Sequence, residues 1–498
     1  MDHKVFHSIK NSLILFVRMI FIMVITLYSS RVLIDVLGIE SYGIYDIVAG
    51  IVILFTVLNS ALTSAVQRFL NITVEDSDKS RFNKYFNISL LVFVLLSLFL
   101  FFIGYIFSEY VVHNFLKIPE NKKYIAIILF KLSLLNLLFQ ILRVPFTAIL
   151  FAYERLGFHS VISVFEAIGK LIVVLSIPFL NYDYLINYST LLVFLTIFIN
   201  ITYIAYLYQV HLLPKFFLVS DLQEYKIMLS FSSYSLLGGV TSMLNQQSNA
   251  ILLNRFFGVI LNAANGVVNQ VNAALFQIMS SIQNAFSPLL MKYFMEGDQT
   301  KIKDIFFLFT RLNVSVYLII AIPLLVLTPE ILNFWLVQVP PSTVAFTRLM
   351  IIGFLFDVLS MPLWTLVHAE GNIKRYQVVI SIIILVNIFV AWLVLSLTKN
   401  PLHLWYVKIL GAILIYLYRY LYIRKIVNHD FNEYFSGSLR YCIQLGFCLG
   451  LSLIVYEYFG NIFIYLISYI IVLFFSIFYC ALSRNEQIFI ISKFLGKR

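Results

Sequence analysis

The sequence predicts an all-α, polytopic transmembrane protein of about fourteen helices. Apolar residues make up 61% of the 498 positions and charged residues only 12%, whereas a soluble domain carries about 25% charged residues. Apolar runs longer than the ~20 residues that cross a bilayer core recur from end to end. In hydrocarbon, runs of this length satisfy their backbone groups only as helices, because open strands leave those groups unpaired.

The apolar runs define the expected helices in chain order, with prolines such as Pro178 and Pro401 near their ends, where proline is tolerated. They cover 11–34, 44–67, 86–107, 124–152, 159–179, 184–208, 230–253, 263–290, 305–327, 344–369, 375–397, 402–423, 438–458 and 461–482. No loop between them is long enough to fold as a separate domain. We therefore expect the function to reside in the helices.

The distribution of basic residues predicts the orientation, because cytoplasmic loops carry an excess of Lys and Arg. Of the 35 Lys and Arg residues, the outer side is expected to hold only Arg31, Lys117, Lys122, Lys123, Arg255, Arg348 and Lys399. Both termini are therefore expected in the cytoplasm. Topology also explains the net charge of +11 without a nucleic-acid partner. The first apolar run is too long for a cleaved signal peptide and is expected to remain as a membrane anchor.

The two halves of the chain resemble each other at an offset of about 220 residues. The paired segments are Arg31–Gly38 with Asn254–Gly258, 58–65 with 281–288, and 152–155 with 369–374. Six helices separate the copies, so both copies start on the same side of the membrane, and parallel repeats of this kind build a central cavity. The repeat predicts two six-helix bundles, 1–215 and 216–425, and two additional helices with a cytoplasmic tail in 426–498.

Polar side chains form stripes along several expected helices. Asn136, Gln140 and Arg143 share one face of the fourth helix. The seventh and eighth helices carry Gln246, Asn249, Asn265, Asn269 and Asn272. Single residues of this kind commonly join helices together. Stripes on corresponding helices of both halves instead favour the lining of a hydrated cavity.

Three cations from different helices, Arg18, Arg143 and Lys170, are expected at nearly one depth. Ionisable groups at the bilayer centre cost at least ~2.5–3.5 kcal/mol unless they are paired or hydrated. Arg18 alternatively extends to the cytoplasmic face, and Lys170 alternatively forms a structural pair with Glu166, one turn away. Arg143 is the strongest candidate for a ligand contact. A ring of cations suits a phosphate or pyrophosphate, because the guanidinium fork matches phosphate oxygens.

Asp357, near the middle of the tenth helix, is expected to be the most buried lone carboxylate. It shares a face with Trp364 and His368. Two roles stay open, namely binding a proton or cation during transport and pairing with a basic side chain. Asp357 and Glu166 together are the basis for a hypothesis of proton or sodium coupling. No catalytic constellation, cofactor motif or metal-ligand spacing is found, so we expect a transporter and not an enzyme.

The stretch Arg31–Leu70, RVLIDVLGIESYGIYDIVAGIVILFTVLNSALTSAVQRFL, resembles the N-terminal signature of bacterial oligosaccharide flippases. These share a superfamily with multidrug/toxin extrusion antiporters and the lipid II flippase. The spans, the repeat and the Ala-x-Glu loop after the fourth helix extend the resemblance over essentially the whole chain. The resemblance implies alternating-access transport of an undecaprenyl-diphosphate-linked oligosaccharide across the bacterial inner membrane, for O-antigen lipopolysaccharide or capsule. The implied partners are the bilayer, this lipid-linked substrate and polysaccharide assembly proteins.

Two alternatives stay open. A drug or cation antiporter on the same fold typically has twelve spans and an acidic cavity. A membrane polymerase or ligase acting on the same sugars generally places its catalytic residues in a sizeable periplasmic loop, and this sequence contains no such loop.

Overall fold

The computed structural model describes residues 3–74, 79–219, 222–371, 373–427 and 431–447, together with positions 450, 467, 469, 470 and 472. Throughout these residues the chain is helical, without β-strands. It forms two compact units, each considered by itself. The first comprises Met1–Val267, Trp335–Thr343 and Ile384–Pro401, and the second Val268–Phe334, Val344–Ile383 and Leu402–Arg498. The predicted segments 1–215, 216–425 and 426–498 follow the sequence repeat and stay a prediction.

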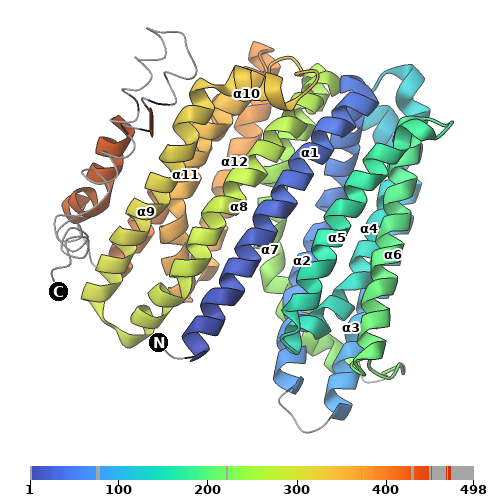
Figure 1. Ribbon diagram of the computed structural model, residues 1–498, viewed down its shortest axis with the longest axis horizontal. Helices are drawn as coiled ribbons and strands as arrows, with labels where there is room; N and C mark the ends of the chain where they lie inside the picture. The colour runs from blue at the N-terminus through green and yellow to red at the C-terminus, as the bar shows by residue number, and fades with distance from the viewer. Residues whose placement is uncertain are drawn as a thin grey trace. The chain divides into compact units, whose positions relative to one another are not determined.

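The first unit is built from long helices that run alongside one another (Figure 1). They are α1 (His3–Leu54), α2 (Thr56–Val74), α3 (Lys79–Tyr110), α4 (Lys123–Ala152), α5 (Leu156–Ser176), α6 (Tyr184–Gln209) and α7 (Leu222–Phe257), with a π-helical turn at Val111–Phe115 and 3-10 turns at Glu120–Lys122 and Ile177–Phe179. On α3, Leu95, Phe99, Phe102 and Ile106 are all exposed. This spacing places them on one face of the helix, an apolar surface suited to lipid.

The second unit contains most of α8 (Val259–Glu296) and the helices that follow it. These are α9 (Gln299–Val326), α10 (Thr328–Trp335), α11 (Thr343–Glu370), α13 (Leu402–Val427) and α14 (Phe431–Tyr434), followed by a π-helical turn at Phe435–Leu439. Helix α12 (Ile373–Thr398) belongs to this unit only up to Ile383, and the rest of it belongs to the first unit. Figure 1 shows α9 and α11 side by side, and the amide of Asn313 on α9 donates to the carbonyl of Val358 on α11 at 2.9 Å. Polar contacts between buried helix faces thus hold this unit together.

Helix α9 begins at a side-chain cap outside the apolar run. Asp298 accepts hydrogen bonds from the Thr300 hydroxyl at 2.7 Å and from the Lys301 amide at 3.1 Å. These bonds, together with the Lys301 ammonium at 3.0 Å, lower the pKa of Asp298 to about 2. The ionised cap therefore satisfies free N–H groups at the start of the helix.

The first two expected spans are joined differently from the prediction. Residues 35–43 were expected to form a loop, but α1 continues through them and bends at Gly38, where φ is 74° and ψ is 163°. Only glycine adopts this backbone conformation readily, because it has no Cβ. A single residue therefore redirects the chain where the sequence suggested a longer connection.

Backbone geometry supports the internal repeat. Gly38 has its counterpart 220 positions later in Gly258, which separates α7 from α8 with a φ of 84°. Glu154, which follows α4 with a φ of 53°, has its counterpart 217 positions later in Gly371, which follows α11 with a φ of 80°. The two halves thus change direction at corresponding residues.

Nine segments of the described chain are long and apolar enough to cross a membrane. They confirm a multi-span membrane protein. Helices α2, α7 and α8 are not among the nine, and α7 and α8 are helices on which the sequence analysis finds polar stripes. Most of the two last expected spans, 438–458 and 461–482, lies outside the described residues.

Candidate functional site

The three cations expected at one depth are grouped by helix α5. Glu166 on α5 accepts from Arg143 Nη1 on α4 at 2.9 Å and contacts Lys170 Nζ at 3.0 Å. Arg18 Nη1 on α1 donates to Ser160 Oγ, also on α5, at 2.9 Å. Three cations and one carboxylate leave two net positive charges. The expected pair of Lys170 and Glu166 forms, and Arg143 joins it.

The sequence of α5 explains this grouping. His159, Ser163, Glu166 and Lys170 follow one another at spacings of four, three and four residues, which places them on one face of the helix. Lys170 is exposed, whereas Glu166 is only partly exposed. The carboxylate therefore lies between a half-buried guanidinium and an accessible ammonium.

Tyr203 on α6 completes the site and was not expected from the sequence. Its hydroxyl forms a 2.8 Å hydrogen bond with His159 Nδ1, and the Arg143 guanidinium carbon lies 5.8 Å from the centre of its ring. Tyr203 is buried. A cation above an aromatic face is attracted by the ring quadrupole, so Tyr203 helps to orient Arg143. The signal in the sequence was the spacing of Thr196, Asn200 and Tyr203, which places them on one face of α6.

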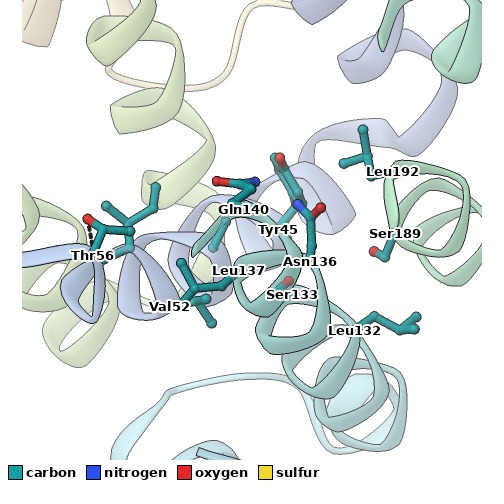
Figure 2. Close-up of a pocket in the computed structure, with 12 residues that line it drawn as sticks. Tyr45, Val52, Thr56, Leu132, Ser133, Asn136, Leu137, Gln140, Ser189 and Leu192 are labelled. Carbon is teal, nitrogen blue, oxygen red and sulfur yellow. Dashed lines mark hydrogen bonds between the residues drawn. The ribbon is translucent and has the colours of Figure 1, made fainter. Parts of the chain in front are cut away.

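The polar stripe of α4 continues from this site along the helix. Asn136 Oδ1 accepts from the Thr196 hydroxyl at 2.6 Å. Asn136 and Gln140 also line a cavity of about 180 Å³, together with Tyr45, Ala49, Val52, Ile53, Thr56, Leu132, Ser133, Leu137, Ser189 and Leu192. Figure 2 shows the polar ends of Tyr45, Asn136 and Gln140 close together. Arg143 follows Gln140 by one helical turn, so the cations lie next to a polar cavity in the same unit.

The polar residues expected on α7 and α8 differ in their surroundings. Asn265 is fully buried, and its amide donates to Asp46 Oδ2 on α1 at 3.4 Å. Gln246 is exposed, whereas Asn249, Asn269 and Asn272 are partly exposed. The structure thus places Asn265 against Asp46 in a packed helix contact and leaves the other four accessible to different degrees.

Asp357 differs from its expected burial. It is exposed, and Arg419 on α13 acts on it electrostatically. The expectation that Asp357 is the most buried carboxylate is therefore wrong, because Asp46 on α1 is less exposed than Asp357. In the described part of the chain, no three His, Cys, Asp or Glu side chains are grouped in a way that would hold a metal ion.

Comparisons with known proteins agree with this architecture. No protein-family model matches the chain. The chain is 23% identical to the uncharacterized membrane protein EpsK of Bacillus subtilis (strain 168) over 431 residues, 83% of each chain. It is similar in structure to the lipid II flippase MurJ in an inward closed conformation, with a TM-score of 0.73, 16% identity, and 98% and 99% of the two chains covered.

A second structural relative is a multidrug resistance MATE family transporter of the MOP superfamily in its inward-facing conformation. Here the TM-score is 0.66 with 12% identity, over 81% of this chain and 94% of the transporter. A MOP superfamily transporter from Pyrococcus furiosus, whose binding pocket has reversed polarity, gives a TM-score of 0.61 with 13% identity, over 84% and 96% of the chains. The chain is therefore a multi-span membrane protein with the all-α fold that MATE and MurJ transporters share.

Proposed function

We propose that this protein is a flippase that moves an undecaprenyl-diphosphate-linked oligosaccharide across the bacterial cytoplasmic membrane. The observation that carries the proposal is the group of cations along α5, where Glu166 pairs with Arg143 and Lys170 and Ser160 accepts a hydrogen bond from Arg18. This group has two net positive charges within membrane-crossing helices. Placing unneutralised cations in a span is costly. An anionic ligand that enters the site offsets this cost.

The chemistry of the site suits a pyrophosphate. Arg143 presents a planar guanidinium whose parallel N–H groups match two phosphate oxygens, and the guanidinium keeps its charge at all relevant pH values. The neighbouring cavity is lined by the amides of Asn136 and Gln140 and by Ser133. Amide and hydroxyl groups exchange hydrogen bonds with sugar hydroxyls. The prenyl tail would remain in lipid while the polar part crosses through the protein.

The fold supports alternating access as the mechanism. Both halves of the repeat bend at a glycine with positive φ, Gly38 in the first and Gly258 in the second. Repeats of this kind alternately expose a site to the two sides of a membrane by rocking one half against the other. Both termini would lie in the cytoplasm, and polysaccharide assembly proteins would receive the translocated oligosaccharide.

A proteoliposome assay tests the proposal with the full-length protein. The substrate is an undecaprenyl-diphosphate-linked oligosaccharide with a fluorescent sugar, and an impermeant quencher reports the fraction in each leaflet. Wild-type protein is expected to equilibrate the lipid between leaflets, whereas protein-free liposomes leave it in place. A wild-type protein that leaves the distribution unchanged but transports a cationic dye would favour the antiporter and overturn the flippase.

Arg143→Ala and Lys131→Ala form a matched pair of variants. Both remove one cation from α4, but Lys131 faces the ring of Tyr105 and pairs with the exposed Glu109 at 3.4 Å. Charged hydrogen bonds contribute about 1.5–3 kcal/mol. Arg143→Ala should therefore slow translocation about 10-fold or more, whereas Lys131→Ala should leave the rate close to that of the wild type.

A further inference from the structure

In the first unit, three residues of α4, α5 and α6 form a triangle of contacts. The Arg143 guanidinium carbon lies 5.8 Å from the ring centre of Tyr203. His159 Nδ1 and the Tyr203 hydroxyl are joined by a hydrogen bond of 2.8 Å. The triangle therefore consists of the Arg143 cation, the Tyr203 ring that it faces, and the His159 ring, which holds Tyr203 in place through the hydrogen bond.

In the second unit, three residues of α11, α12 and α13 form a matching triangle. The Arg419 guanidinium carbon lies 5.3 Å from the ring centre of Trp364. Arg419 Nε donates to the Tyr376 hydroxyl at 2.7 Å. Tyr376 is fully buried, so the Nε bond holds the guanidinium against a fixed partner.

The two triangles occupy corresponding positions of the repeat. Trp364 follows Arg143 by 221 positions, Tyr376 follows His159 by 217, and Arg419 follows Tyr203 by 216. These offsets match the 220 and 217 positions that separate the corresponding backbone turns. Both triangles contain one contact between a cation and an aromatic ring and one hydrogen bond. The cation lies on α4 in the first half, whereas in the second half it lies on α13, the counterpart of α6.

The two cations also lie at similar depths along their own helices. Arg143 precedes the end of α4 at Ala152 by nine residues, and Arg419 precedes the end of α13 at Val427 by eight. At 1.5 Å per residue these separations are about 13 Å and about 12 Å. Each half therefore carries an aromatic-supported guanidinium between two and three turns before the described end of its helix.

The charge of Arg419 is less neutralised than that of Arg143. Arg143 is paired with Glu166 at 2.9 Å. Among the described residues no carboxylate forms an ion pair with Arg419, although Asp357 acts on it electrostatically from α11. With Nε bonded to Tyr376, the two terminal nitrogens of the guanidinium are left to present a fork.

The surroundings of Arg419 are open to a ligand. Trp364 is partly exposed and His368, whose ring centre lies 4.1 Å from that of Trp364, is exposed. The ring of Tyr418 stacks on that of Tyr376, with ring centres 5.9 Å apart, and the tilted ring of Tyr422 lies 5.4 Å from Tyr376. A guanidinium that is held over the Trp364 ring and oriented by the Tyr376 hydroxyl is a chemical arrangement suited to oxyanions.

We propose that Arg419 forms a second oxyanion subsite, in the second half of the protein, that takes one phosphoryl or carboxylate group of the substrate through its two terminal nitrogens. Trp364 and Tyr376 act as positioning residues that hold the guanidinium in this orientation. The inference rests on the proposed function, because it assigns a second contact for the same class of anionic substrate.

Binding to the purified full-length protein in nanodiscs tests the subsite. The probes are undecaprenyl diphosphate, which has a pyrophosphate and no sugar, undecaprenol, which has neither, and a soluble oligosaccharide bearing a uronic acid carboxylate. Trp364 fluorescence reports occupancy, after the other three tryptophans of the chain are replaced by Phe. Arg419→Ala should weaken binding of the anionic probe about 10-fold or more, and Arg424→Ala, near the end of the same helix, should not.

The two sources of the anion are distinguished by the probes. If Arg419→Ala weakens only undecaprenyl diphosphate, the subsite takes the pyrophosphate, and if it weakens only the acidic oligosaccharide, it takes a sugar carboxylate. Arg419→Lys keeps the charge but loses the fork, so it should restore less than half of the lost affinity. If Arg419→Ala does not fold, binding is measured with Arg419→Lys and Tyr376→Phe instead. Tyr376→Phe should lower the affinity for the anionic probe about 3-fold.

The failure of this inference differs from failure of the proposed function. The subsite alone is overturned if the Arg419 variants bind every anionic probe with wild-type affinity while the protein still translocates lipid-linked oligosaccharide. A wild-type protein that neither translocates the oligosaccharide nor binds an anionic probe overturns both.

Discussion

Replacing Glu166 by Gln removes the one carboxylate that joins Arg143 to Lys170 and keeps nearly the same side-chain shape. The site then carries three positive charges where the wild type carries two. We expect lower stability because an uncompensated guanidinium remains among the helices. We also expect tighter binding of an anionic substrate and slower release of it, because the substrate now replaces the missing carboxylate.

The size of the stability effect follows from the two ion pairs. Glu166 and Arg143 are 22% and 19% exposed at the side chain, whereas Lys170 is 52% exposed. At about 4 Å between charge centres and an effective dielectric constant of about 20, a pair is attracted by ~4 kcal/mol before its desolvation is subtracted. The exposed Lys170 pair adds at most about 1 kcal/mol. We therefore expect Glu166→Gln to destabilise the protein by about 2–4 kcal/mol, mostly through Arg143.

A double-mutant cycle measures this coupling. The variants are Glu166→Gln, Arg143→Ala and the two combined, unfolded reversibly in mixed micelles. Because the double variant contains no unpaired guanidinium at position 143, it should be more stable than the sum of the single changes predicts, by about 2–3 kcal/mol. Additivity within about 0.5 kcal/mol would refute the reasoning, because the pair would then contribute no net interaction energy.

Three other predictions concern the fold and ion coupling. Gly43→Ala should destabilise the protein more than Gly38→Ala, since the new Cβ would lie 1.9 Å from the carbonyl oxygen of Val259. A Cβ at Gly38 meets nothing within 4 Å and adds only backbone strain of about 1–3 kcal/mol; equal thermal stabilities of the two variants would contradict this. Asn254→Ala should cost about 1–3 kcal/mol, because the side chain is fully buried and its oxygen accepts a backbone hydrogen bond at 2.8 Å; unchanged thermal unfolding would show that the bond is dispensable. Asp357→Asn should abolish any acceleration of flipping by an imposed proton or sodium gradient, while the rate of flipping without a gradient should stay unchanged. If the variant in proteoliposomes still responds to the gradient, Asp357 takes no part in coupling.

Some features of the site followed from local sequence. The spacing of Asn136, Gln140 and Arg143 predicted one polar face of α4, and the structure places two of these residues at a cavity and the third among the cations. Spacing along one helix is a local property, because each residue turns the chain by a fixed angle. The common depth expected for Arg18, Arg143 and Lys170 stays a prediction, whereas their grouping along α5 is seen in the structure.

Other features required contacts between distant helices. Arg419 was not among the candidate ligand contacts of the sequence analysis, and it is the contacts with Tyr376 and Trp364, on two other helices, that single it out. Asn265 belonged to a stripe expected to line a cavity, and Asp46 instead binds it in a buried contact. A helical pattern shows which residues share a face, but it does not show which neighbouring helix covers that face.

The sequence by itself determined the membrane class, the helical state and the repeat, because hydrocarbon permits few backbone solutions and charge is excluded from most of each span. Only the tertiary structure decided which cations meet which partners. Glu166 joins Arg143 and Lys170, while the second half supports Arg419 with aromatic rings and no ion-paired carboxylate among the described residues. The physical reason is that side-chain pairing depends on helix packing, which brings together residues separated by tens of positions along the chain.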